Sequence, residues 1–168
     1  MTSKVLTTVG REVMAEAFSA LPFVAALSAG DPTWDPLWTD PNPPSPGLDA
    51  TAVADLIGYV RPTLVDFVEP DPAGTIVTEE GGTFTGAAGR SRYLRVRLSI
   101  PAGAFPDVYV REIGILANPA FIEGLAPGKT VLDPGDVTAA GDLVHLLWSP
   151  PQFLNAGTAY ARNFILKV

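Results

Sequence analysis

Proline and glycine set the strongest limit on what this chain can fold into. The sequence contains 17 prolines and 16 glycines in 168 residues, about a fifth of the chain, and they separate short apolar segments. Proline lacks a backbone N–H and glycine weakens helices, so long regular elements are often interrupted. Because 47% of the residues are hydrophobic, the chain can still form a core. The combination predicts a loop-rich β protein, folded as a single domain over residues 1–168.

The first predicted element is a helix that begins near residue 8. Either Thr7 or Thr8 can cap its N-terminus. Apolar side chains recur at the spacing of one helical face, and we expect that face to pack against the rest of the domain. Its members are Val13, Met14, Ala17, Phe18 and Leu21. A second, shorter helix is predicted over residues 49–58, with Asp49 as its cap.

Short alternating segments predict the strands. The clearest covers residues 92–100, where Tyr93, Arg95 and Arg97 share one face and aliphatic side chains share the other. Further strands are predicted at residues 23–27, 63–69, 75–78, 108–116, 143–148 and 163–168. The expected fold class is α+β: one N-terminal helix packed on a mostly antiparallel β-sheet, or a small β-sandwich, of six to seven short strands with a long proline-rich loop.

That loop covers residues 32–47, PTWDPLWTDPNPPSPG, and holds six of the prolines. Prolines bias the backbone toward extended geometry, so the segment is predicted to be an irregular excursion over the surface. It also carries Trp34 and Trp38, which a purely solvated linker does not need. Either the two tryptophans pin the loop to its own domain, or they are presented to a partner as a candidate interface.

Charge is unevenly distributed along the chain. Lys and Arg number 11 against 18 Asp and Glu, a net charge of −7, which argues against a nucleic-acid partner. Acidic residues dominate 31–89, whereas arginines dominate 90–111. This asymmetry predicts charge-complementary contact, within the chain or between copies. Tyr93, Arg95 and Arg97 are accordingly either a candidate interface or an ordinary solvated or internally paired face of a sheet. No segment is apolar enough to predict membrane insertion.

The sequence nominates no catalytic residue, cofactor or metal. It has no cysteine, which excludes thiolate chemistry. The segment 123–130 ends like a phosphate-binding loop, but Glu123 occupies the place of its first glycine. His145 is the only histidine and lies in an alternating strand, so a structural role is expected. We therefore expect a protein that is not an enzyme.

Three stretches resemble the N-terminal attachment domain of phage tail fibre, or tail-collar fibre, proteins. The first is Thr7–Gly10 with its following helix and the apolar run to Asp31, similar to that family's opening "TT-x-G", helix, strand and "GDG" turn. The second and most specific is 93–116, with Ile100-Pro101 and then VREIGIL, similar to "IP…G-F-x-I-R-E-I-G-L". The third is 141–144 with a terminal strand, similar to "G-x-L-I-A".

The resemblance implies a baseplate-associated structural protein of a phage or phage-like tail, commonly a trimer. It implies other tail and baseplate proteins and a tail fibre as partners, with residence in the virion tail and in the host cytoplasm during assembly. The sequence stops where a fibre protein would begin its shaft, so a baseplate component or adaptor to which a separate fibre attaches is expected. The alternative is a receptor- or carbohydrate-binding β module at the tail tip.

Three residues of the most specific stretch form a candidate structural motif. Arg111 lies on one face of its strand, while Glu112 and Gly114 share the other with apolar residues. A carboxylate among apolar residues needs donors, and Arg92, Arg61 or Arg162 is the expected partner of Glu112. Gly114 is expected to mark a bulge or a close approach of backbone. A pair of this kind can specify the fold without touching another protein.

Overall fold

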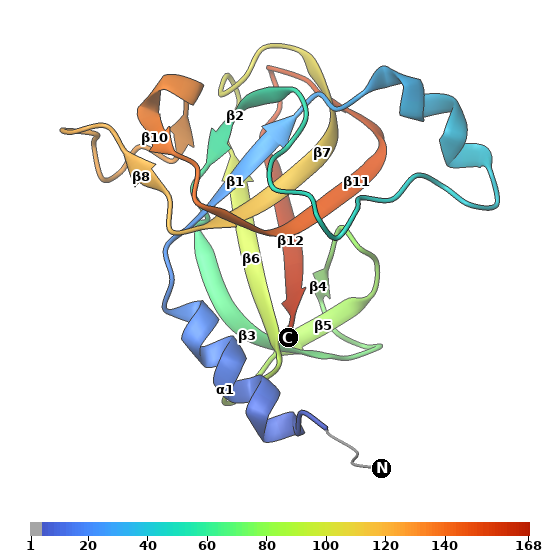
Figure 1. The fold of residues 1–168 in the computed structure, drawn as a ribbon, viewed down its shortest axis with the longest axis vertical. Coiled ribbons are helices and arrows are strands. Elements are labelled where there is room, and N and C mark those ends of the chain that lie inside the picture. Colours follow the sequence, from blue (N-terminus) through green and yellow to red (C-terminus); the bar gives the residue numbers. More distant parts are fainter. Residues whose placement is uncertain (1–4) are drawn as a thin grey trace. The chain divides into compact units, whose positions relative to one another are not determined.

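A computed structural model describes residues 5–168. These residues form one α-helix, two 3-10 helices and twelve strands, and the strand pairs of defined register are antiparallel (Figure 1). The predicted α+β class with mostly antiparallel sheets is confirmed. The helices are α1 (Thr8–Ser19), η1 (Pro32–Thr39) and η2 (Pro134–Asp136). The strands are β1 (Phe23–Ser28), β2 (Leu56–Val60), β3 (Leu64–Pro70), β4 (Ile76–Val77), β5 (Thr83–Gly86), β6 (Tyr93–Ile100), β7 (Val108–Ala117), β8 (Ala120–Phe121), β9 (Val131–Leu132), β10 (Val137–Ala139), β11 (Asp142–Leu154) and β12 (Tyr160–Lys167).

The chain groups into two compact units, and each unit draws on separated stretches of sequence. Unit 1 comprises Met1–Leu21, Thr63–Leu98 and Arg162–Val168, and unit 2 comprises Pro22–Pro62 and Ser99–Ala161. Each unit has a hydrophobic cluster of its own. The single domain expected over residues 1–168 stays a prediction.

Unit 2 is built on a sheet of five strands in the order β11-β7-β1-β2-β9. The central strand β1 is buried along its whole length, as its uninterrupted apolar run predicts. In register, Ala26 lies between Tyr59 of β2 and Gly114 of β7. The buried cluster on this sheet consists of Val24, Ala26, Tyr59, Leu116 and Leu132.

The strand β11 forms one edge of this sheet and carries two prolines. It pairs with β7 along its length, with register shifts between Leu143 and His145 and again between Trp148 and Gln152. The second shift spans Pro150 and Pro151, which lack the N–H that a continuous ladder requires. The edge is therefore interrupted in its middle.

Unit 1 contains α1 and most of the second sheet, whose strand order is β12-β6-β3-β5-β4. The segment after β4 meets the far strand β12: Glu79 N donates to Asn163 O at 3.0 Å, and Asn163 Nδ2 donates to Val77 O at 3.0 Å. Ile165 N donates to a carboxylate oxygen of Glu80 at 3.2 Å. These bonds close the sheet on itself around the cluster of Val68, Phe84 and Ile165.

The predicted helix over residues 49–58 is wrong. Residues 49–55 form bends and irregular backbone, and β2 begins at Leu56. The sequence of β2 combines β-prone side chains with Gly58, which favours a strand over a helix, and β2 pairs with both β1 and β9. The predicted six to seven strands are too few, because strands of two or three residues such as β4, β8 and β9 have no alternation to detect.

The helix α1 begins as predicted, since the Thr7 side chain accepts a hydrogen bond from Gly10 N at 3.1 Å. Its predicted buried face is wrong. Val13 and Met14 are exposed, and the buried residue is Ala15.

Candidate functional site

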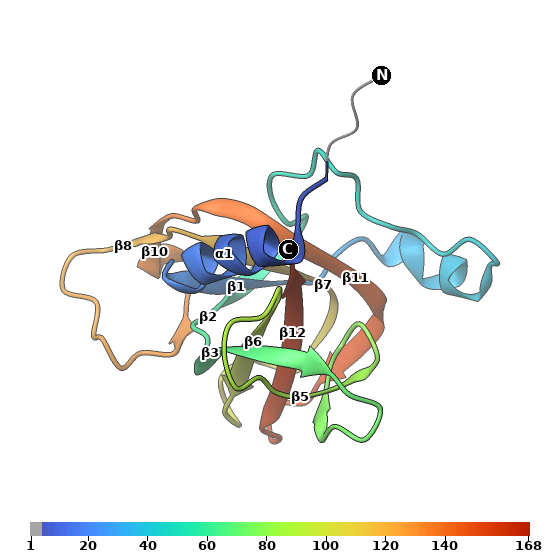
Figure 2. The ribbon, with the colours of Figure 1, turned by 90° about the horizontal axis from the view of Figure 1, so that it is seen from below.

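The candidate site is an arm, residues 32–47, that leaves the end of β1 and returns toward β2. Its first half is η1, a 3-10 helix where an irregular backbone was predicted, and its second half is irregular, as predicted, and contains four prolines. Figure 1 and Figure 2 both show the arm extending away from the strands of unit 2. Its sequence explains this form, because prolines at the start and inside η1 remove backbone donors that a longer α-helix would need.

Arg111 of β7 anchors the base of the arm. Its Nε donates to Asp35 Oδ1 at 2.7 Å, and its Nη2 donates to Asp35 Oδ2 at 2.8 Å. Its Nη1 donates to Ala29 O at 3.0 Å. The hydrogen bonds from the guanidinium hold the pKa of Asp35 below its usual value, and the carboxylate raises the pKa of Arg111. This bidentate pair fixes the direction as well as the position of η1.

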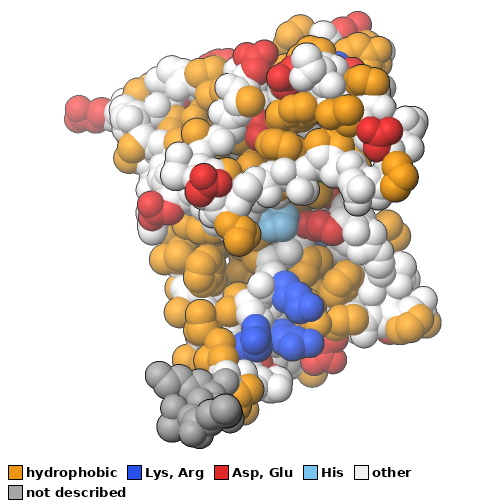
Figure 3. All heavy atoms as spheres, turned by 45° about the vertical axis from the view of Figure 1, so that its right-hand side comes forward, with side chains coloured by type: hydrophobic (Ala, Val, Ile, Leu, Met, Phe, Trp, Pro, Cys, Tyr) orange, Lys and Arg blue, Asp and Glu red, His pale blue; other side chains and the backbone are white. Residues whose placement is uncertain are grey.

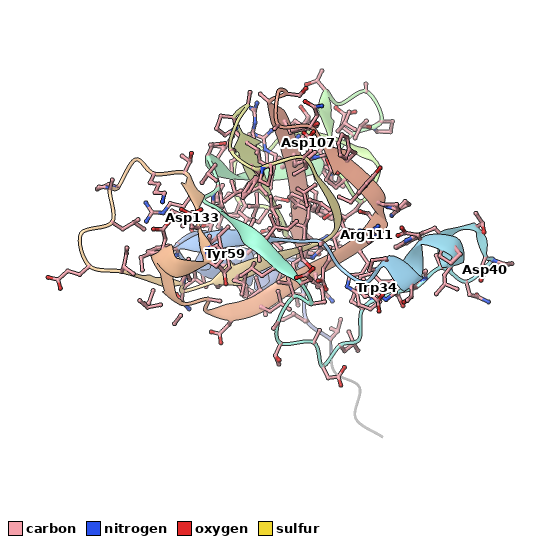
Figure 4. All side chains as sticks on the ribbon, turned by 90° about the horizontal axis from the view of Figure 1, so that it is seen from above. Trp34, Asp40, Tyr59, Asp107, Arg111 and Asp133 are labelled. Carbon is pink, nitrogen blue, oxygen red and sulfur yellow. The ribbon has the colours of Figure 1, made fainter. Side chains whose placement is uncertain are left out.

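A stacked pair of tryptophans makes the second anchor. The rings of Trp34 in η1 and Trp148 in β11 lie 4.0 Å apart at an interplanar angle of 22°. Figure 4 shows Trp34 beside Arg111 at the base of the arm, with Asp40 at the arm's outer end. The interpretation in which the tryptophans pin the loop therefore holds for Trp34.

Glu112 fixes the ring on which Trp34 stacks. Its Oε1 accepts from Trp148 Nε1 at 2.8 Å, and its Oε2 accepts from Ala54 N at 2.6 Å. The side chain is buried, as its inward position predicts. The expected arginine partner is wrong: Arg61 donates to the carbonyl of Pro127 and Arg92 to the hydroxyl of Tyr93. Two neutral N–H donors satisfy the carboxylate where we expected a cation.

The remaining candidate partner of Glu112, Arg162, pairs with Glu79 in unit 1.

Gly114 was expected to mark either a bulge or a close approach of backbone, and the structure shows the close approach. A Cβ at this position would lie 2.8 Å from Leu143 Cδ1 and 2.9 Å from Val53 Cγ1. The glycine therefore lets β11 and the segment around Val53 pack directly on β7.

Gly30 has a related role that the sequence did not reveal. Its φ is +63°, and a Cβ there would lie 2.8 Å from Arg111 Cβ and 2.9 Å from Trp34 Cζ3. Both the backbone conformation and the space require glycine. Asp31 then begins η1 by accepting from Thr33 N at 2.8 Å, which lowers the pKa of Asp31. The Gly30-Asp31 turn was visible in sequence, but its contact with Arg111 was not.

Trp38 differs from Trp34. It lies further out on η1, is half-buried, and its Nε1 has no hydrogen-bond partner among residues 5–168. Its neighbour Leu37 is 41% exposed. Trp38 therefore stays a candidate interface residue.

The three candidate interface residues on β6 separate into different roles. Tyr93 is half-buried and makes an edge contact with Phe84, with ring centroids 5.9 Å apart. Arg95 is paired with Asp66 on β3 by two hydrogen bonds of 2.7 and 2.6 Å. Arg97 is exposed. Within this set, only Arg97 presents its charge fully to solvent.

The described residues offer no cluster of three or more metal-ligating side chains. Within the same part of the chain, no helix is long and apolar enough to cross a membrane. What unit 2 does present is a projecting segment held by an ion pair, a ring stack and a required glycine. Such a segment is suited to ordered contact with another macromolecule.

The fold and this site define an α+β module with a projecting, anchored arm. The chain belongs to a family of phage baseplate proteins: residues 3–168 match the family described as "Baseplate wedge 3 tail fiber network component". It is thus a structural component of a bacteriophage tail, located in the virion and interacting with other tail and baseplate proteins. No curated protein matches the sequence.

Proposed function

We propose that this chain is the adaptor that attaches tail fibres to the baseplate, that it has no enzymatic activity, and that the arm is the attaching element. The observation that carries the proposal is the anchoring of the arm in unit 2. Arg111, Asp35, Trp34 and Trp148 restrain its base, so a partner that binds the outer half does not have to order the whole segment. The family description, which names a fibre network, supports the same role.

The proposed partners are the tail fibre and neighbouring baseplate proteins, without nucleic acid or membrane. We further propose that the chain is present in the host cytoplasm before assembly and acts as a homo-oligomer, with a trimer favoured. The distribution of apolar and charged side chains supports assembly contacts. In Figure 3, basic side chains gather in one patch with an acidic side chain at its edge, and other acidic side chains are scattered among hydrophobic ones on that face.

A phage that carries Trp38→Ala tests the role of the arm. Purified particles are analysed by quantitative mass spectrometry for this chain and for the fibre protein. The expected result is particles that keep the chain and lose fibres. Ile122→Ala is the matched control, since Ile122 is also a partly exposed apolar residue of unit 2 but lies outside residues 32–47. Absence of the chain from intact wild-type particles would overturn the proposal.

The same phage separates the adaptor from a receptor- or carbohydrate-binding module. An aromatic platform made by both tryptophans is disfavoured because Trp148 covers one face of Trp34. If Trp38→Ala particles keep a full set of fibres but no longer adsorb to cells, the binding module replaces the adaptor. A zymogram of the purified chain tests the absence of enzymatic activity, and clearing of cell wall material would contradict it.

A further inference from the structure

The two units carry very different charges. Unit 2 has eleven acidic and three basic residues, a formal charge of −8, whereas unit 1 has seven acidic and eight basic residues, a charge of +1. The net −7 of the chain therefore belongs to one unit. Such segregation matters for association, because complementary surfaces steer and orient partners.

Unit 2 cannot neutralise its own carboxylates. All three of its basic side chains are already engaged: Arg111 with Asp35, Lys129 with Asp133 and Asp136, and Arg61 with backbone carbonyls and the ring of Phe121. Asp40, at the outer end of the arm, forms no ion pair among residues 5–168 and is exposed. The arm thus carries an unpaired negative charge away from the sheet of its own unit.

Unit 1 is close to neutral overall, but it keeps cations that are not paired with a carboxylate. Its carboxylates Glu16, Asp66 and Glu79 are paired with arginines. Four other cations have no carboxylate within ion-pair distance in the described part of the chain: Arg11 on α1, and Arg92, Arg97 and Lys167, which we name the basic patch.

The patch is organised around Tyr93. The Arg92 guanidinium lies 5.0 Å and Lys167 Nζ 5.8 Å from the centroid of its ring. Arg97 follows on the same face of β6, opposite the partly exposed Leu64 of β3. Two cations on one ring repel each other, and a bound carboxylate would relieve that repulsion. The apolar surface of Leu64 beside Arg97 offers a contact for proline rings or Leu37.

We propose that the arm of one copy docks on the basic patch of a second copy, with Asp40 facing Arg92, Arg97 and Lys167. This head-to-tail contact uses two different surfaces of the chain, so it can close into a ring such as a trimer. The proposal deepens the proposed function and rests on its homo-oligomer: the arm joins neighbouring copies of the chain into the assembly to which the fibre attaches, so loss of the arm contact would also lose the fibre. Charge complementarity and the restrained base of the arm carry the choice of partner.

The experiment measures self-association of the purified full-length chain by sedimentation velocity. Association should weaken at least about tenfold between about 0.05 M and about 0.5 M NaCl, because salt screens exposed charges. Asp40→Lys alone, and Arg97→Glu with Lys167→Glu, should each be monomeric where the wild-type chain associates. Glu123→Lys in unit 2 and Arg11→Glu in unit 1 are the controls: they change the charge by the same amount per site, outside the arm and the patch.

Mixing the two kinds of variant is the decisive step. A chain with Asp40→Lys and a chain with Arg97→Glu and Lys167→Glu should associate with each other at low salt, although neither associates alone. Circular dichroism spectra that match the wild-type spectrum show that each variant is folded. A wild-type chain that is monomeric at low salt and high concentration overturns the proposal, and so does association that neither reversal weakens. If that chain is still found in particles with its fibres, the adaptor function stands without this contact.

Discussion

Two arginine–aspartate pairs, one in each unit, have nearly the same local geometry and different consequences. Arg95 and Asp66 in unit 1 have side chains 12% and 32% exposed, and Arg111 and Asp35 in unit 2 have side chains 10% and 34% exposed. Both pairs are bidentate. The first joins directly opposite residues of neighbouring strands, whereas the second joins a strand to the arm. The same interaction therefore reinforces a sheet in unit 1 and positions a separate segment in unit 2.

The largest expected effect concerns the residue next to Arg111. Glu112→Ala leaves the N–H groups of Trp148 and Ala54 buried without an acceptor, and should lower the free energy of unfolding by about 3 kcal/mol. Glu16→Ala, which removes the exposed partner of Arg90 in unit 1, should cost about 1 kcal/mol or less. Urea denaturation of both variants measures the difference. An equal loss in the free energy of unfolding for both variants would contradict the larger role assigned to Glu112.

The second prediction uses glycines in strands of the two units. Gly114→Ala should destabilise the protein by about 1–3 kcal/mol, because its Cβ would press on Leu143 and Val53. Gly86→Ala in β5 meets no atom within 4 Å and should change the stability by less than about 0.5 kcal/mol. Thermal unfolding monitored by circular dichroism compares the two. If Gly114→Ala leaves the unfolding temperature unchanged, the side chains of Leu143 and Val53 move aside freely.

Exchange of backbone amides tests the comparison of the two pairs directly. Arg111→Ala should speed hydrogen exchange of the Thr33 and Trp34 amides at least about tenfold, because η1 loses its anchor. Arg95→Ala should leave those amides unchanged, since its loss affects only the face of the second sheet. NMR-detected exchange resolves individual amides. Equal acceleration by both variants would contradict the distinction between a reinforced sheet and an anchored arm.

The smallest effect is a pH dependence of the arm. The Asp35 and Asp31 carboxylates have lowered pKa values in the folded protein, so their stabilising hydrogen bonds are complete above the usual Asp pKa of about 3.9 and are lost as the pH falls below it. Tryptophan fluorescence, which reports the stack of Trp34 on Trp148, should change as the pH falls below about 4. Asp35→Asn should flatten that change, while Asp40→Asn, outside the anchor, should preserve it.

The sequence predicted the elements whose pattern is local. The alternation of residues 92–100 locates β6 and both of its faces, and the capping threonine locates the start of α1. It also drew attention to Arg111, Glu112 and Gly114. Their partners were beyond its reach, because Asp35 is 76 residues from Arg111 and Trp148 is 36 residues from Glu112. The topology that brings β7, β11 and η1 together determines those contacts, and no local period encodes it.

The prediction of which face of α1 is buried was wrong for a related reason. Helical periodicity shows which residues share a side, but not which side is buried. Ala15 is buried while Val13 is 47% and Met14 44% exposed, so the apolar face that the periodicity identifies is not the side that turns inward.

The paired prolines of β11 affect whether the edge of the sheet can pair with strands of other proteins. An uninterrupted edge strand of this length would offer a template on which strands of other copies could add without limit. Pro150 and Pro151 interrupt that template, because neither can donate a backbone hydrogen bond to an added strand. The interruption protects the edge of the sheet against open-ended strand addition where many tail proteins are packed together.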